Sequence, residues 1–170
     1  MVDREKLGLY LWRSAGTESA AASIFFKLVT YLKPEDGYTA VRFGLEELAH
    51  ASLLRECAKQ YVPVRPAHLI RPLTWPSDPR VALAAVNQAE RMSIPGFWKM
   101  YDLGCELGDG RIVDAYCRIL KEEPPHMEWG KQLLRQFRQD PILHDTILAY
   151  LKTRPITREY RQVSKERPWE

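Results

Sequence analysis

Apolar residues recur every three or four positions along most of this 170-residue chain, which is the spacing of one face of an α-helix. Prolines and glycines interrupt the pattern at a few places and divide it into separate stretches. These stretches predict helices over residues 4–32, over residues 35–61, from Pro79 to about Gly108, from after Gly110 to about Phe137, and a short fifth helix that follows Asp140-Pro141 and ends before Pro155. We therefore expect an all-α protein.

The break between the second and third helices is the longest, and its residues 62–79 contain five prolines. Such a stretch cannot form a long helix, because proline lacks a backbone N–H and its ring clashes with the preceding turn. Four-helix bundles of up-and-down topology use short loops throughout, whereas another class carries a long connection that crosses the bundle. The pattern predicts the second class, with the fifth helix packed over one end of the bundle.

Prolines also fall inside two of the predicted helices. Pro95-Gly96 lies within the third helix, and Pro124-Pro125 lies within the fourth. Each proline removes a helical hydrogen bond, so we expect a kink in the third helix and a kink or bulge in the fourth. At the start of the third helix, Ser77 or Asp78 is expected to cap the free N–H groups, with Pro79 at the first helical position.

Glutamates and histidines occupy inward positions of the four long helices in a pattern that occurs twice. Each copy has a lone glutamate followed about thirty residues later by a Glu-x-x-His pair; the two pairs stand 76 positions apart and the two lone glutamates 72. Residues three apart on a helix share a face, so each pair directs a carboxylate and an imidazole to the same place. Four carboxylates and two imidazoles are the donor set of two-metal sites in helical bundles. The candidate metal ligands are Glu18, Glu47, His50, Glu90, Glu123 and His126.

A less specific interpretation makes Glu18 and Glu90 surface or boundary residues and His50 and His126 hydrogen-bonded core residues. A single Glu-x-x-His pair arises easily by chance, but two copies with a lone glutamate on each remaining helix are harder to explain in that way. Glutamates that converge inside a bundle would repel one another unless metal ions or protons neutralised them. We therefore expect a metal site, with no catalytic side chains beyond the ligands.

Over residues 8–138, the chain resembles the ferritin-like di-iron carboxylate superfamily. The resemblance rests on Glu18, Glu47-Leu48-Ala49-His50, Glu90 and Glu123-Pro124-Pro125-His126, which occur in the order of the family. It implies a ferritin-like four-helix bundle that binds two iron ions, with manganese or a mixed pair as alternatives. It also implies that Glu47 and Glu123 bridge the metals and that every other ligand holds one metal. The two prolines depart from the family pattern and place the bridging role of Glu123 in question.

The resemblance divides into branches that differ in what they oxidise. One branch uses dioxygen and an electron donor protein to hydroxylate a small organic substrate; the segment from Arg65 to Trp75 resembles demethoxyubiquinone hydroxylases, and transfer-RNA hydroxylases stay open as well. A second branch comprises rubrerythrin-like peroxidases and ferroxidases, which carry an extra glutamate where this chain has Ser93, and rubredoxin cysteines that it lacks. A third alternative is a non-catalytic bundle that its metal stabilises. We expect an oxygenase or hydroxylase.

Several residues near the predicted site could assist it. Tyr116, two turns before Glu123, could approach a metal or be a hydrogen-bonded core tyrosine. Asn87, one turn before Glu90, is a candidate hydrogen-bond partner for a ligand. His68 and His144 lie outside the repeated pattern and are not expected to bind metal. The residues that could line an apolar pocket, or simply pack in the core, are Phe25, Phe43, Phe97 and Tyr101.

Composition bears on the partners and the cellular location that we expect for the protein. The net charge of +3 and the calculated pI near 8.8 are mildly basic, and the basic residues are scattered, so nucleic-acid binding is not expected beyond the transfer-RNA alternative. The three cysteines form no C-x-x-C pair, which argues against disulfides, a zinc ribbon or a rubredoxin-type centre and favours the cytoplasm. No apolar run reaches the roughly 18 residues of a membrane span.

The length predicts one domain. Residues 1–153 would form the di-metal helical bundle, and residues 154–170 a C-terminal tail that has too few periodic apolar residues for a helix. A homodimer is the default expectation for the assembly, because small bundles often pair.

Overall fold

The structure, a computed structural model, describes residues 2–67 and 75–153; within them five α-helices and one 3₁₀ turn occur, and no strand. The all-α class is therefore confirmed, and each helix ends within a few residues of its predicted boundary. The predicted tail, residues 154–170, and His68 lie outside the described residues. The elements are α1 (Arg4–Leu28), η1 (Val29–Tyr31), α2 (Pro34–Lys59), α3 (Pro79–Leu107), α4 (Gly110–Phe137) and α5 (Pro141–Thr153).

Aspartate side chains define the starts of four helices. Asp3 caps α1, and Asp78, rather than Ser77, caps α3 by accepting a backbone N–H of the first turn. Asp109 and Asp140 accept two backbone N–H groups each at the starts of α4 and α5. These groups have no partner within a helix, so the aspartates explain why the helices begin where they do.

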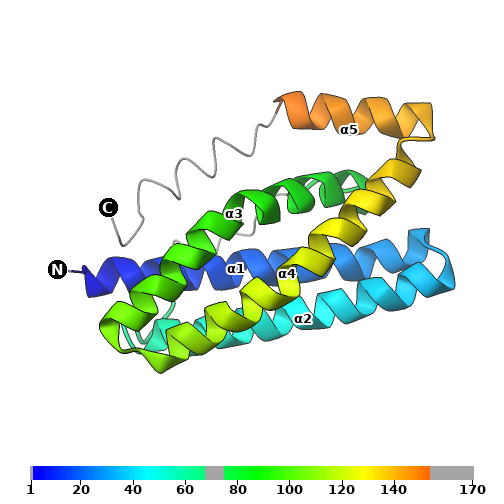
Figure 1. Ribbon diagram of the computed structural model, residues 1–170. Coiled ribbons are helices and arrows are strands. Elements are labelled where there is room, and N and C mark those ends of the chain that lie inside the picture. The colour runs from blue at the N-terminus through cyan, green and yellow to red at the C-terminus, as the bar shows by residue number, and fades with distance from the viewer. Residues whose placement is uncertain (1, 68–74, 154–170) are drawn as a thin grey trace.

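The four long helices form two antiparallel pairs, α1 with α2 and α3 with α4, and the pairs pack together through α1 with α3 and α2 with α4 (Figure 1). α2 ends beside the turn between α3 and α4, where the Tyr61 hydroxyl donates to the Asp109 carboxylate over 2.5 Å. α3 begins at the other end of the bundle, where α5 packs against it (Figure 1). The connection between α2 and α3 therefore joins opposite ends of the bundle.

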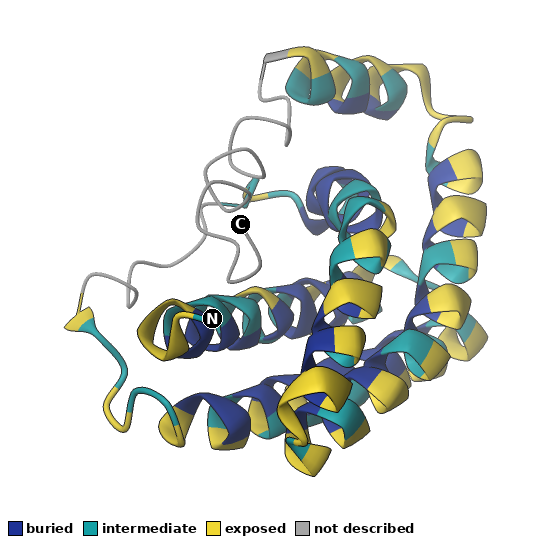
Figure 2. Ribbon diagram, turned by 60° about the vertical axis from the view of Figure 1, so that its left-hand side comes forward, coloured by how far each residue is buried: buried dark blue, intermediate teal, exposed yellow. Residues whose placement is uncertain are grey.

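Apolar side chains form two buried clusters, and Figure 2 shows the buried faces of the long helices turned toward the interior. Leu11 and Ile119 belong to one cluster, and Phe25 and Leu133 to the other. On every long helix the predicted metal ligands fall between the residues of the two clusters, so they form a polar layer across the core. No described helix combines the length and the apolar character that a bilayer span requires.

Helices α3 and α4 run without interruption through their internal prolines. The bulge that was one alternative for α4 is therefore not seen, and Figure 1 shows α3 changing direction near its middle, in agreement with its expected kink. Pro95, Pro124 and Pro125 all lie on exposed faces. Water can there solvate the carbonyl groups that lose their helical donors, which lowers the cost of a proline inside a helix. Glu123 and His126 thus keep the regular spacing that directs both side chains inward.

Candidate metal centre

The structure buries the predicted ligands in the interior of the bundle. Glu47, His50 and His126 have no exposed surface, Glu123 is 1% exposed and Glu18 is 6% exposed. Glu90 is partly buried, but its Oε1 atom is inaccessible to solvent. The interpretation that places Glu18 at the surface is therefore wrong.

The six side chains converge in two overlapping groups. Ligand atoms of Glu18, Glu47, His50 and Glu123 all lie within 4.8 Å of one another, and so do those of Glu47, Glu90, Glu123 and His126. Glu47 and Glu123 belong to both groups, whereas each remaining residue belongs to one. Each group could hold one metal ion, and the two ions would then share two carboxylates.

Several buried atoms of these groups have no hydrogen-bond partner among the described residues. They are Glu47 Oε2, Glu90 Oε1, His50 Nδ1 and both carboxylate oxygens of Glu123. Leaving a buried polar atom unsatisfied costs about 1–3 kcal/mol, and more for a charged group. Cations between the carboxylates would satisfy these atoms, so the residues present fit a pair of metal ions.

The pKa values of the buried glutamates and histidines are shifted by burial and by their mutual interactions. Burial raises the pKa values of Glu18 and Glu90 well above 4.5, and neighbouring carboxylates raise them further. Burial alone would raise the pKa of Glu47, but hydrogen bonds, chiefly from His126, lower it to about 2. Burial opposes a charged His50, yet Glu123 and Glu47 raise its pKa to about 10. Protons on these groups therefore balance the buried negative charge, and cations would compete with them.

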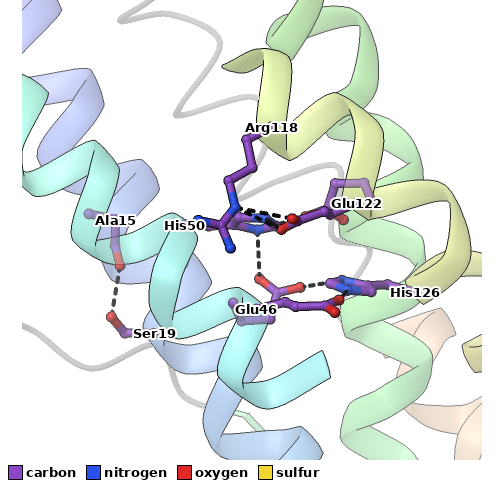
Figure 3. Close-up of polar contacts among 9 residues, drawn as sticks. Ala15, Ser19, Glu46, His50, Arg118, Glu122 and His126 are labelled. Atoms are coloured by element: carbon purple, nitrogen blue, oxygen red, sulfur yellow. Dashed lines mark hydrogen bonds and ion pairs between the residues drawn. The ribbon is translucent and has the colours of Figure 1, made fainter. Parts of the chain in front are cut away.

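Two further glutamates orient the histidines from outside the groups. Nε2 of His50 lies 2.8 Å from Glu122 Oε2, and Nε2 of His126 lies 2.7 Å from Glu46 Oε2 (Figure 3). Glu122 also accepts from Arg118. A proton on each Nε2 leaves Nδ1 as the ligand atom, and the Nδ1 atoms face Glu47 and Glu123 at 2.7–3.8 Å. Glu46 and Glu122 therefore favour Nδ1 as the ring nitrogen that would bind a metal.

Glu46 and Glu122 were not predicted from the sequence. Their contacts are crossed, because α2 provides the partner of the α4 histidine and α4 provides the partner of the α2 histidine. The chain does carry a signal for them, since both repeated motifs read Glu-Glu-x-x-His. Comparing the two copies position by position would have revealed the extra shared glutamate.

Replacing Glu122 with alanine is expected to weaken metal binding about 10- to 100-fold, the usual effect of removing a group that orients a ligand histidine. Competition with a chelator of known affinity would measure this. Glu122→Gln should recover most of the loss, because its amide oxygen can accept from His50 Nε2. The matched control is Glu128→Ala, which removes a carboxylate on α4 that pairs with Lys131 at the surface. Equal losses in both alanine variants would contradict the assigned role.

The predicted aromatic residues divide between three places. Phe25 and Phe43 pack around His126, with ring centroids 5.9 Å and 4.3 Å from the imidazole. Phe97 belongs to the other apolar cluster, where it lies beside Tyr116. Tyr101 does not lie at the site: it is half-buried and packs edge to face with Trp98. The buried face of α3 continues from Phe97 through Met100 and Leu103, which leaves position 101 at its margin.

Tyr116 is fully buried but contributes no atom to either group. Burial raises the pKa of its phenol well above 10, and Glu18 adds to this shift. The side chain is therefore a neutral phenol packed in the apolar cluster that contains Leu11 and Ile119. His144, on α5, is likewise absent from both groups.

Asn87 contacts the main chain next to a ligand. Its Nδ2 donates to the Met127 carbonyl over 2.7 Å, which ties α3 to the turn of α4 that carries His126. Gly130 provides the space, because a Cβ atom at that position would lie 2.8 Å from Asn87 Nδ2. Asn87 therefore positions the backbone of α4 and does not hold a ligand side chain directly.

Substituting Gly130 with alanine is expected to destabilise the protein by about 1–3 kcal/mol, because the added methyl group must displace the buried Asn87 amide. Urea unfolding followed by circular dichroism would measure the change. Gly110→Ala, where a Cβ would meet no neighbour, serves as a control for the glycine-to-alanine exchange itself. A Gly130 variant as stable as this control would show that Asn87 can move at no cost.

A small cavity of about 30 Å³ adjoins the groups on the side away from the histidines. Glu18, Glu90 and Glu123 contribute to its wall, together with other residues of α1 and α3 and with Trp75. Neither ligand histidine is among the described lining residues. Exogenous molecules that reach the candidate metal centre through this cavity would therefore meet the carboxylate side.

Comparison of the chain with known protein families, curated proteins and solved structures reveals no significant match.

Proposed function

We propose that this protein is a non-haem di-iron oxidoreductase of the ferritin-like type, which uses dioxygen or peroxide as its oxidant. The observation that carries the proposal is the pair of overlapping buried groups that share Glu47 and Glu123. Two antiparallel helix pairs and a connection that joins opposite ends of the bundle support the ferritin-like assignment.

The donor set supports iron or manganese over other metals. Zinc sites are mostly four-coordinate and rich in histidine or cysteine, and calcium and magnesium take oxygen ligands alone. Four carboxylates with two imidazoles instead suit a pair of iron or manganese ions. Iron bound here would supply the electrons that reduce dioxygen or peroxide.

In the proposed reaction the protein would position the two metal ions and exclude water from them. Glu47 and Glu123 would lie between the two ions, while Glu18 with His50 and Glu90 with His126 would complete one position each. Glu46 and Glu122 keep each Nδ1 directed inward, and the apolar clusters on both sides exclude bulk water. The cavity beside the carboxylates is the place where an exogenous molecule can approach.

Two kinds of substrate are consistent with this site. Oxygenation of an organic substrate is favoured by Ser93, whose hydroxyl donates to the Ala89 carbonyl at the position where rubrerythrin-like peroxidases carry an extra glutamate. A peroxidase or ferroxidase is the second candidate, and the small size of the cavity favours it. The cavity has about the volume that peroxide requires, and an aromatic ring is several times larger.

Reconstitution with iron(II) under anaerobic conditions tests the proposal. We expect about two metal ions per chain, one for each group, and anomalous scattering at the iron and manganese edges between α1, α2, α3 and α4. The di-ferrous protein is then mixed with dioxygen and with peroxide. Fast reaction with dioxygen supports the oxygenase, and fast reaction with peroxide alone supports the peroxidase. A protein that binds no metal would overturn the proposal.

A further inference from the structure

The cavity beside the candidate metal centre has a defined size. Its volume of about 30 Å³ compares with the roughly 10–15 Å³ that a single water molecule needs. It therefore has room for about two water-sized atoms. Dioxygen, hydrogen peroxide and the slender azide ion are of this size, whereas a six-membered ring is several times larger.

The residues that line the cavity differ in how firmly the surrounding structure holds them in place. Helices α1 and α3 contribute small residues such as Ala21 and Ala89, and Phe97 is held in the core against Tyr116. Among the described lining residues, Trp75 alone lies outside a helix. Its side chain is half-buried, and its indole Nε1 has no hydrogen-bond partner in the described part of the chain.

We propose that Trp75 determines the largest ligand that can reach the carboxylate side of the metal centre. With the indole in place the cavity accepts a ligand of two or three non-hydrogen atoms, and a ring-containing ligand enters where the indole is displaced or removed. Trp75 is thus a specificity-determining residue. This inference rests on the proposed di-metal function, because it describes access to that same site.

The experiment compares a small and a large anionic ligand of iron(III). Azide and phenol are titrated into the di-ferric protein, and the charge-transfer absorption of each complex reports binding directly. We expect wild-type protein to bind azide and to exclude phenol. In Trp75→Ala, phenol binding should tighten at least about tenfold, while azide binding changes little. Trp98→Ala is the matched control, because Trp98 is 53% exposed on α3 and lies outside the cavity wall.

A second variant fills the cavity instead of opening it. Ala89→Leu should weaken azide binding about tenfold or more while the metal content stays unchanged. Phenol binding that is equal in wild-type protein and Trp75→Ala would overturn the proposal. So would azide binding that is unaffected in Ala89→Leu.

Metal content is measured first, so that failure of the di-metal function is recognised separately. If the protein binds no metal, crystals of the metal-free protein are soaked with benzene. Density for the ring between α1 and α3 in Trp75→Ala but not in wild-type protein would support the role of Trp75. Density in both proteins, or in neither, would overturn it.

Discussion

Replacement of Glu47 by alanine will remove both metal ions from the reconstituted protein. Glu47 belongs to both ligand groups and is completely buried, so its loss deprives each cation position of a ligand at once. The substitution also leaves His126 Nδ1 without the carboxylate that lies 2.7 Å away. Elemental analysis after reconstitution and desalting should find about two metal ions per wild-type chain and almost none per variant chain.

Two further variants separate a shared ligand from an unshared one. Glu18 belongs to one group only, so Glu18→Ala should weaken one metal position and leave the other occupied. Glu56→Ala removes an exposed glutamate of the same helix as Glu47, one that pairs with Lys59, and should bind the full complement. Retention of two ions by Glu47→Ala would show that the two groups do not share this carboxylate.

The metal-free protein will lose stability as the pH rises from about 6.5 to about 10. His50 has its pKa raised from 6.5 to about 10, so its stabilising charge is fully present below pH 6.5 and is lost through pH 10. Glu18 and Glu90 also have raised pKa values, and their stabilising protons are lost as the pH rises above 4.5. Thermal unfolding should show Tm falling by about 5 °C or more over this interval.

Metal ions should reverse this trend. Metals compete with protons for the same ligands, so binding strengthens as the pH rises and stabilises the folded state. Tm of the metal-loaded protein should therefore stay constant or rise between pH 6.5 and pH 9. Glu47, with a pKa lowered to about 2, loses its contribution only in acid below pH 4.5. A metal-free Tm that is independent of pH would contradict the buried charge balance described above.

Local chemistry made the helices and the convergence of the six candidate ligands predictable. Asp78-Pro79 and Asp140-Pro141 mark helix starts because a side-chain acceptor precedes a residue that needs no donor. Glu47 and His50 share a face because the helix repeat brings residues three apart together. The repeated spacing then placed equivalent residues on α4, and the structure brings both sets into contact.

Contacts between helices were harder to anticipate. Glu46 is rotated by about 100° from Glu47 around the axis of α2. When α2 is considered alone, Glu46 is therefore expected to face solvent. Only the packing of α2 on α4 brings it to His126. Tyr101 lies away from the site for a related reason, because it is at the margin of the buried face of α3. A bulge was one alternative at the prolines of α4, because their exposure, which lets the helix continue through them, could not be judged from the sequence.

The crossed contacts of the two histidines have a consequence for how the protein opens. The α1–α2 pair cannot satisfy His50 without Glu122, and the α3–α4 pair cannot satisfy His126 without Glu46. Separation of the pairs leaves charged groups in both halves without partners at the same moment. Native-state hydrogen exchange should therefore find the amides of the two halves opening in one cooperative unit, and not as two independent hairpins.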